Sequence, residues 1–259
     1  MLVLLLSGSF LYLLSYRYFW KANSAFGKQS PGFEMISHRG VTTNAPENTI
    51  ESFKIALECN VAGLEFDIQF TKDNQLVVYH NYSIETSSNI IKVADLNLSE
   101  IKNLNLGFTI PTFEDVLKIC PSDKIINVEI KSTNIFHTNI VQKTLTFLKK
   151  YNLVENVIIS SFNPFVLIEI NRQSNDMKIG LLWSKDISEK WYVTRYTNKI
   201  LRPYSLHADI NYINKDIRLW ANQNGMKLFL YTVNTAKQVE IAKTVKADGI
   251  FSDYPNILE

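Results

Sequence analysis

The sequence predicts an α/β fold with a parallel sheet covered by helices, a TIM-type (β/α)8 barrel preceded by a single N-terminal hydrophobic (transmembrane) helix. Three observations lead to this prediction. Short β-branched runs alternate with amphipathic stretches from Phe33 onward. A chain of 259 residues with 46% hydrophobic content can bury a large core, and its length fits one α/β-barrel domain as well as two small domains. The first 16 residues carry no charged side chain. An open doubly wound sheet remains an alternative, although the chain has no G-x-G-x-x-G motif or P-loop.

The expected strands and helices alternate within one domain. The strands are expected at Phe33–Ser37, Gly63–Phe70, Gln75–Tyr79, Ile125–Ile130, Val157–Ser161, Lys178–Trp183, Leu206–Ile210, Lys227–Val233 and Gly249–Phe251. The helices are expected at Glu47–Cys59, Phe113–Cys120, Thr138–Tyr151, Pro164–Arg172, Lys215–Asn224 and Ala236–Val245. Nine strands are one more than a barrel needs. Either Gln75–Tyr79 forms a hairpin with the strand before it, or the last run pairs at a rim.

The N-terminus differs from the rest of the chain. Residues 1–20 are expected to form a transmembrane anchor, 21–31 a linker and 32–259 the barrel domain. Sixteen uncharged, mostly apolar residues span roughly 24 Å as a helix, and extension to Trp20 reaches the ~30 Å hydrocarbon core if Arg17 extends to the interface. A cleaved signal peptide and a soluble helix are the alternatives. Lys21 and Lys28 follow the span, so the positive-inside rule predicts a single-pass membrane protein with a cytoplasmic domain.

Charge and cysteine content exclude two classes of protein. The chain has 27 basic and 25 acidic residues and no basic cluster, which argues against a nucleic-acid partner. Two cysteines, Cys59 and Cys120, are too few for a disulfide framework and are expected to be small buried side chains.

Acidic residues alternate with apolar ones in the strand Gly63–Phe70. A period of two puts Leu64 and Phe66 on one face and Glu65 and Asp67 on the other. In a barrel the apolar face packs on the helices, so both carboxylates would point inward, where they stay ionised only beside a cation. Oxygen ligands suit Mg²⁺ or Ca²⁺. In a sheet with one wet face, the same two residues would simply face solvent.

A second strand repeats this pattern. In Ile125–Ile130 and the residue that follows, Asn127, Glu129 and Lys131 share one face. In barrels the carboxyl ends of the strands carry the chemistry. We therefore expect three carboxylates to hold a divalent ion, with Lys131 attracting an anionic substrate. The alternative is a buried ion pair between Glu129 and Lys131.

Two of the four histidines also end strands. His38 closes an apolar run and is followed by Arg39, and His80 closes a second run. Two histidines at the same end of a barrel are a plausible general acid and base near neutral pH. Arg39 would bind a phosphate oxygen. His137 and His207 are expected to be structural.

An ordered set of motifs resembles the glycerophosphodiester phosphodiesterase family, from about Phe33 to Pro255. The set comprises Ser37-His-Arg-Gly40, Pro46-Glu-Asn-Thr49, Leu64-Glu-Phe-Asp67, Thr71-Lys-Asp73, Val77-Val-Tyr-His80, Val128-Glu-Ile-Lys131, Ser160-Ser-Phe162, Tyr231-Thr-Val-Asn234 and Asp248-Gly-Ile-Phe-Ser-Asp-Tyr-Pro255.

The resemblance implies a barrel related to the phosphatidylinositol-specific phospholipases C, with one divalent cation, Mg²⁺ or Ca²⁺. The cation would be bound by Glu65, Asp67 and Glu129. Glu47 would support this site or interact with a helix dipole.

The same resemblance implies a reaction. His38 and His80 would act as acid and base, and Arg39 and Lys131 would hold the phosphate. Family members release sn-glycerol 3-phosphate and an alcohol from glycerophosphodiesters, so the expected partner is a small-molecule glycerophosphodiester or lysophospholipid. A lysophospholipase D-type activity is an alternative that aromatic side chains at the barrel mouth would favour. The candidates are Phe162, Phe165, Trp183 and Trp191.

Three positions depart from the family pattern. The second histidine is normally followed by Asp, where this chain has Asn81, and the family's nearby arginine is absent, with Thr86 in that segment. Tyr231 replaces a tryptophan. Asparagine stabilises an imidazolium less than aspartate does. These departures leave open a catalytically impaired barrel that binds phosphate or lipid.

Overall fold

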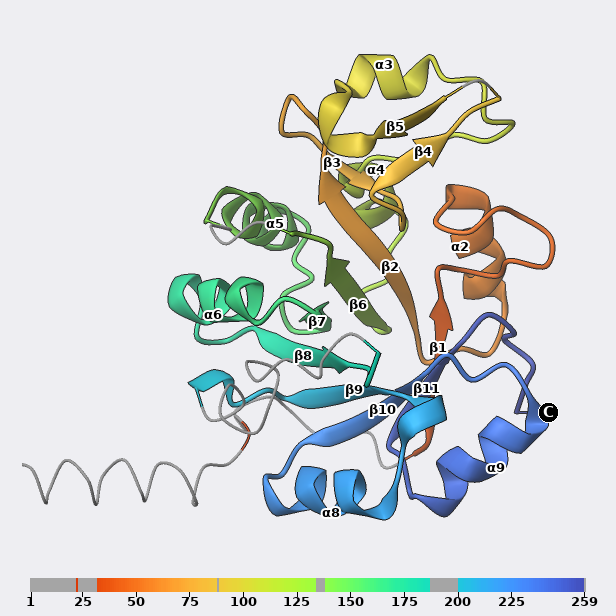
Figure 1. Cartoon of the computed structure of the whole chain (residues 1–259), viewed down its shortest axis with the longest axis vertical. Coiled ribbons are helices and arrows are strands. Elements are labelled where there is room, and N and C mark those ends of the chain that lie inside the picture. Colours follow the sequence, from red (N-terminus) through yellow and green to blue (C-terminus); the bar gives the residue numbers. More distant parts are fainter. Residues whose placement is uncertain (1–21, 23–31, 88, 134–137, 187–199, 259) are drawn as a thin grey trace, which may run out of the picture.

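A computed structural model describes residues 22, 32–87, 89–133, 138–186 and 200–258 (Figure 1). Eight parallel strands of this part of the chain close into a barrel in which β1 pairs with both β2 and β11. The strands are β1 (Glu34–His38), β2 (Gly63–Phe70), β6 (Ile125–Ile130), β7 (Val157–Ser161), β8 (Lys178–Trp183), β9 (Ser205–Asp209), β10 (Lys227–Tyr231) and β11 (Gly249–Ser252). The predicted barrel is confirmed, and the open sheet is excluded.

The ninth predicted strand forms a hairpin. β3 (Leu76–Val78) runs antiparallel to β2, with Ile68 opposite Val78. Gly249–Ser252 belongs to the barrel itself, because it pairs with β1 and β10. The first of the two alternatives for the extra strand is therefore correct.

Helices surround the barrel, as Figure 1 shows. They are α2 (Ile50–Glu58), α4 (Phe113–Leu117), α5 (Thr138–Lys150), α6 (Pro164–Gln173), α8 (Lys215–Gln223) and α9 (Ala236–Thr244). α2 begins three residues later than predicted, because Thr49 caps it: Thr49 Oγ1 accepts from the backbone N–H of Ser52, and Ser52 Oγ accepts from that of Thr49. Glu47 therefore precedes the helix.

The core has two layers, as the alternation on β2 predicts. Phe66 points outward and packs against Phe53 of α2 and Phe113 of α4, with ring centroids 5.6 and 6.1 Å apart. Inside the barrel a separate cluster fills the space between the strands. It contains Ile36, Ile158, Phe229 and Phe251.

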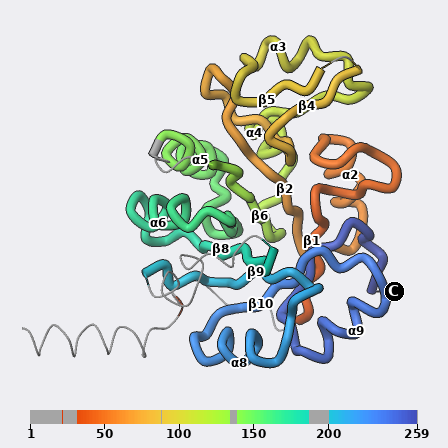
Figure 2. Tube along the Cα trace, viewed as in Figure 1, coloured from red at the N-terminus to blue at the C-terminus, as the bar shows by residue number. Residues whose placement is uncertain are grey.

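A small lobe, which the sequence pattern did not predict, follows β3. It contains β4 (Ser83–Glu85), β5 (Ile90–Lys92), the 3-10 turn η1 (Val93–Asp95) and α3 (Leu98–Lys102). Figure 2 shows it beyond the far end of β2. The lobe has its own apolar cluster, built on Val77, Ile84, Val93, Ile101 and Ile110. Its strands have three residues each, too few to show a periodicity.

The predicted single-pass membrane localisation with a cytoplasmic domain requires correction. Within the described ranges, none of the helices is both apolar enough and long enough to cross a bilayer. The longest of them, α5, has 13 residues and spans roughly 20 Å, against a hydrocarbon core of about 30 Å. The predicted helix at residues 1–20 and all of the linker except Ala22 lie outside the described residues. The backbone N–H of Ala22 donates to Asn224 O, 2.7 Å away.

Candidate active site

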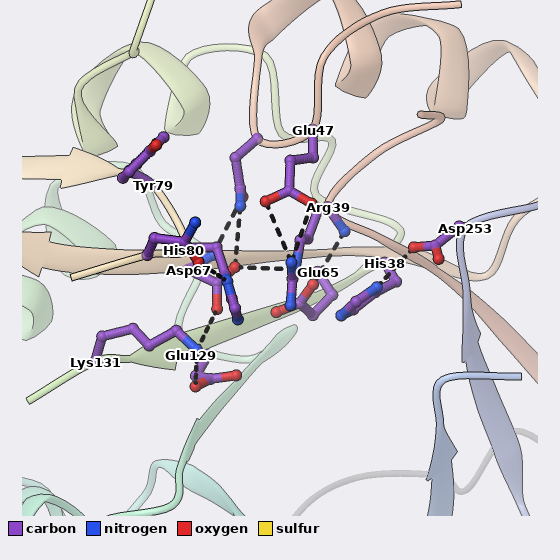
Figure 3. A network of polar contacts seen from close by, with 12 residues as sticks. His38, Arg39, Glu47, Glu65, Asp67, Tyr79, His80, Glu129, Lys131 and Asp253 are labelled. Atoms are coloured by element: carbon purple, nitrogen blue, oxygen red, sulfur yellow. Dashed lines mark hydrogen bonds and ion pairs between the residues drawn. The ribbon is translucent and has the colours of Figure 1, made fainter. Parts of the chain in front are cut away.

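A cavity of about 830 Å³ opens at the carboxyl ends of the strands, where all seven predicted site residues lie (Figure 3). Six of them line it directly, and Asp67 lies beneath Lys131 and Arg39, in ion-pair contact with both. The cavity-lining members are His38, Arg39, Glu65, His80, Glu129 and Lys131. The structure therefore brings together side chains from three strands and one hairpin.

The three predicted metal ligands are neighbours. Asp67 of β2 is in register with Glu129 of β6, and Glu65 lies two residues earlier on β2. One carboxylate oxygen from each residue lies within 4.8 Å of the others. The exposed fractions are 4% for Glu65, 0% for Asp67 and 8% for Glu129. Burial excludes the alternative that these carboxylates face solvent.

Two cations lie beside the carboxylates. Lys131 Nζ is 2.9 Å from Glu129 Oε1 and 3.3 Å from Asp67 Oδ1. Arg39 Nε is 3.4 Å from Asp67 Oδ2. The Glu129–Lys131 ion pair, which was the alternative to a metal site, is thus present within the carboxylate trio and does not exclude it.

Burial and charge act differently on the three carboxylates. Burial raises the pKa of Glu65 well above its ordinary value, and the Asp67 charge adds to this. Burial also raises the pKa of Glu129 to about 7, against the opposing effect of Lys131. At Asp67 burial again acts to raise the pKa, but Lys131 and Arg39 outweigh it and lower the value to about 2. The two cations thus keep Asp67 ionised at neutral pH.

The donor set fits a hard divalent cation. Three carboxylates supply oxygen ligands, which Mg²⁺ and Ca²⁺ prefer. Asp67 Oδ1 is buried and makes no hydrogen bond within the described residues; its only ion-pair contact there is with Lys131 Nζ at 3.3 Å, so it can still serve as a ligand. A divalent ion would also favour the charged forms of Glu65 and Glu129, which burial disfavours.

Each histidine has one ring nitrogen already engaged. His38 Nδ1 lies 2.7 Å from Asp253 Oδ1, and Asn234 Nδ2 donates to the other oxygen of Asp253 at 2.5 Å. His80 Nδ1 lies 2.8 Å from Asn81 Oδ1. Burial lowers the pKa of His80; Asp67 acts to raise it, and Lys131 to lower it. In both histidines, Nε2 is the nitrogen that these contacts leave for a substrate.

Arg39 is held by its backbone and its side chain. Its φ of 58° is in the left-handed region. Its N–H donates to Glu65 Oε2 at 3.0 Å, and Nη1 donates to both carboxylate oxygens of Glu47, at 3.0 and 3.2 Å. Glu47 therefore orients Arg39, and neither of its predicted roles, metal support or helix dipole, describes this contact.

Sequence reasoning assigned no role to Asn48, Asn234 or Asp253, although all three stand in the motifs that carried the resemblance. Asn48 Nδ2 donates to Asp67 Oδ2 at 2.9 Å, and its Oδ1 accepts from the Asp67 N–H. All three follow a turn or strand end, where no periodicity predicts the direction of a side chain.

The departures from the family pattern fall in different places. Asn81 contacts His80, whereas Thr86 lies in the lobe, where its N–H and Oγ1 both donate to Asn89 O. Tyr231 lines the cavity and donates to Trp183 O. His207, expected to be structural, is buried in β9 but also lines the cavity; His137 lies outside the described residues.

Comparison with known proteins agrees with this geometry. Residues 38–257 match the model of the glycerophosphoryl diester phosphodiesterase family. A glycerophosphodiester phosphodiesterase from Caldanaerobacter subterraneus subsp. tengcongensis is 36% identical over 235 residues, which cover 86% of this chain and 95% of that protein.

Two solved structures share the fold. A Silicibacter pomeroyi protein described as a putative glycerophosphoryl diester phosphodiesterase has a TM-score of 0.80 at 22% identity, covering 89% of this chain and 92% of its own. A phosphodiesterase from Oleispira antarctica, solved with its product sn-glycerol-3-phosphate, has a TM-score of 0.75 at 22% identity, covering 86% and 93%. The family match and the 36% identical relative confirm the resemblance: this chain belongs to the glycerophosphoryl diester phosphodiesterase family, whose members are phosphoric diester hydrolases.

Proposed function

We propose that this chain is a metal-dependent hydrolase that cleaves glycerophosphodiesters to sn-glycerol 3-phosphate and an alcohol, a reaction of glycerophospholipid metabolism. One observation carries the proposal: two cations, two histidines and two buried carboxylates line a single cavity, and the third carboxylate, Asp67, forms ion pairs with both cations. The name of the Caldanaerobacter relative and the product bound by the Oleispira enzyme support this substrate class. The catalytic domain would comprise residues 32–259.

The proposed metal ligands are Glu65, Asp67 and Glu129. A bound Mg²⁺ or Ca²⁺ would neutralise negative charge on the non-bridging phosphate oxygens as the transition state forms.

Arg39 and Lys131 are proposed to hold the phosphate. Lys131 Nζ has three donors, and two carboxylate oxygens lie near it, so one donor can turn to the substrate. Arg39 is fixed by Glu47 on one side and lines the cavity on the other. Both cations therefore face the place where a phosphate would meet the carboxylate trio.

The acid and the base are proposed to be His38 and His80, each acting through Nε2. One removes a proton from the attacking group, which is either water or the glycerol 2-hydroxyl of the substrate. The other donates a proton to the departing alkoxide. Asp253 and Asn81, which contact the two Nδ1 atoms, fix the ring orientations that these transfers require.

The fold favours neither alternative, although the lysophospholipase D alternative has one of its expected features. For a lysophospholipase D, an N-terminal membrane anchor would have to hold the barrel mouth near a lipid surface. Ala22, however, contacts Asn224, just before β10 begins and so at the end opposite the cavity. Of the four aromatic candidates, Phe162 and Phe165 line the cavity, as this alternative expects. The backbone carbonyl of Trp183 accepts a hydrogen bond from Tyr231, and Trp191 lies outside the described residues. A barrel that only binds phosphate has no need of the paired histidines.

The test uses the full chain with glycerophosphocholine and lysophosphatidylcholine, with and without EDTA, followed by Mg²⁺ or Ca²⁺. We expect metal-dependent release of glycerol 3-phosphate, lost in Glu65→Ala and His38→Ala. Glu51→Ala, at an exposed position of α2, is the matched control and should retain activity. Release of lysophosphatidic acid alone would support the lipid alternative instead. Metal binding without turnover of either substrate would contradict the proposal.

A further inference from the structure

A third polar side chain on the inward face of β2 serves neither the metal site nor the phosphate. Gln69 follows Glu65 and Asp67 at the same period of two and is 5% exposed. Its Nε2 donates to Tyr79 O at 2.7 Å and to Asn81 O at 2.9 Å. The two hydrogens of this amide nitrogen thus reach the carbonyl groups of the residues on either side of His80.

The backbone around His80 needs such a contact, because the β2–β3 ladder ends there. β3 ends at Val78, and the last ladder contact is the donation from the Tyr79 N–H to Asp67 O, 3.0 Å away. His80 comes next, at the point where the chain turns away toward the lobe. Gln69 continues the pairing of β2 with this segment through a side chain, over the residues where backbone pairing has stopped.

Asn81, whose carbonyl group Gln69 binds, also contacts the ring of His80. Asn81 Oδ1 lies 2.8 Å from His80 Nδ1, so Nδ1 carries the proton in the neutral ring and Nε2 is left as an acceptor. Gln69 binds the backbone carbonyl of Asn81 and so fixes the backbone from which the Asn81 side chain extends. That side chain selects the tautomer of His80. The backbone and the ring of His80 therefore depend on one buried amide.

We propose that Gln69 is a positioning residue for His80, and that it couples this histidine to the strand that carries Glu65 and Asp67. The inference rests on the proposed function, in which His80 is the acid or the base. It predicts that Gln69 affects the chemical step and leaves binding of substrate and metal nearly unchanged.

The first measurement compares Gln69→Met with the wild type and with Gln75→Met. Methionine keeps the volume but removes both donors. Gln75 lies just before β3, where its amide donates to Asp73 O and accepts from Lys143, outside the cavity. We expect kcat for glycerophosphocholine to fall about 100-fold in Gln69→Met, as small misplacements of reacting groups cause, with KM within about twofold. Gln75→Met should match the wild type.

The second measurement is independent of turnover. Long-range ¹H–¹⁵N spectra of the Mg²⁺-loaded chain at pH 8 report the tautomer of each histidine ring, and the His80 signals are identified by their loss in His80→Phe. We expect a single Nδ1–H tautomer in the wild type and a mixture in Gln69→Met. Gln69→Asn keeps the amide but shortens its reach, and gives the same comparison if the methionine variant does not fold.

Unchanged His80 signals in a folded Gln69 variant would overturn the proposal, whatever the change in kcat. An unchanged kcat in an active enzyme would also overturn it. If the wild type turns over no glycerophosphodiester, the proposed function fails, while the tautomer measurement still decides whether Gln69 orders His80.

Discussion

Asp253 Oδ1 lies 2.7 Å from His38 Nδ1, across the seam where β11, the last strand of the barrel, pairs with β1, the first. The two residues are 215 positions apart, and only closure of the barrel brings them together. Figure 3 shows this pair on one side of the carboxylate trio and His80 on the other. Asn234 completes the arrangement, because its Nδ2 donates to Asp253 Oδ2 and its Oδ1 accepts from the Asp253 N–H.

Asp253→Asn should lower kcat roughly 100-fold with little change in Tm, because an amide can present its N–H groups to Nδ1 and favour the wrong tautomer of His38. Steady-state kinetics and thermal unfolding, with exposed Asp95→Asn as the control, check this. A large loss of Tm at unchanged kcat would mean that the aspartate only holds the barrel closed.

Addition of Mg²⁺, Ca²⁺ or Mn²⁺ should stabilise the metal-free chain. A ligand at 100 times its Kd raises the free energy of unfolding by about 2.7 kcal/mol. Denaturant titrations with and without metal measure the effect. Glu65→Gln should remove most of it, because one of three ligands is lost. Equal stabilisation of this variant would place the metal elsewhere.

The affinity for the cation should rise as the pH rises toward 7 and above. The pKa of Glu129 is raised to about 7 by burial, so below this pH the ion must displace a proton. The same shift predicts that the metal-free chain loses stability as the pH rises from about 4.5 to 7, since the folded state binds the proton more tightly than the unfolded state.

Titrations of Mn²⁺ binding between pH 5.5 and 8, with unfolding measured in EDTA over the same range, test both statements. Glu129→Gln should flatten both dependences. A wild-type affinity that does not change with pH would contradict the raised pKa.

Asn81→Asp should shift one limb of the pH profile of kcat/KM, the limb set by the ionisation of His80, to higher pH. Burial lowers the pKa of His80, and a carboxylate beside Nδ1 would stabilise the imidazolium. If His80 is the base, activity at acidic pH falls; if it is the acid, activity extends further into alkaline pH. The profile of kcat/KM therefore also assigns the role. Asn81→Ser, which adds no charge, is the control, and an identical shift in both variants would exclude a charge effect.

Gly180→Ala should destabilise the fold by about 1–3 kcal/mol. A Cβ at Gly180 would lie 2.6 Å from His207 Cε1 and 2.7 Å from its Nε2, inside the barrel. Urea unfolding measures the loss, and the double variant with His207→Ala should lose less than the sum of the single variants. Full additivity would show that the two side chains do not compete for the same space.

Much of the barrel and of the carboxylate trio was predictable, because the burial of a strand imposes an alternation of apolar and polar residues along it. In β2 the alternation of Phe66 with Glu65 and Asp67 indicated which side chains point inward. The same period in β6 added Glu129 and Lys131. Strand ends placed His38 and His80 at one end of the barrel. The family resemblance then supplied their expected roles.

Other features had no such signal. The lobe after β3 is built from three-residue strands, and its burial depends on a cluster that forms only when these pieces meet. Asn48 and Arg39 both have a φ of 58°, so their side chains leave turns in directions that alternation does not describe.

The sequence by itself determined which strand side chains face the helices and which face the inside of the barrel. It therefore determined the parallel barrel and the identity of its inward carboxylates. Only the tertiary structure decided which partners those side chains meet: Asp253 for His38, Glu47 for Arg39 and Gln69 for the carbonyls around His80. The reason is physical. Periodicity is a local property of one strand, whereas a hydrogen bond or an ion pair depends on distances between strands, which closure of the barrel alone fixes.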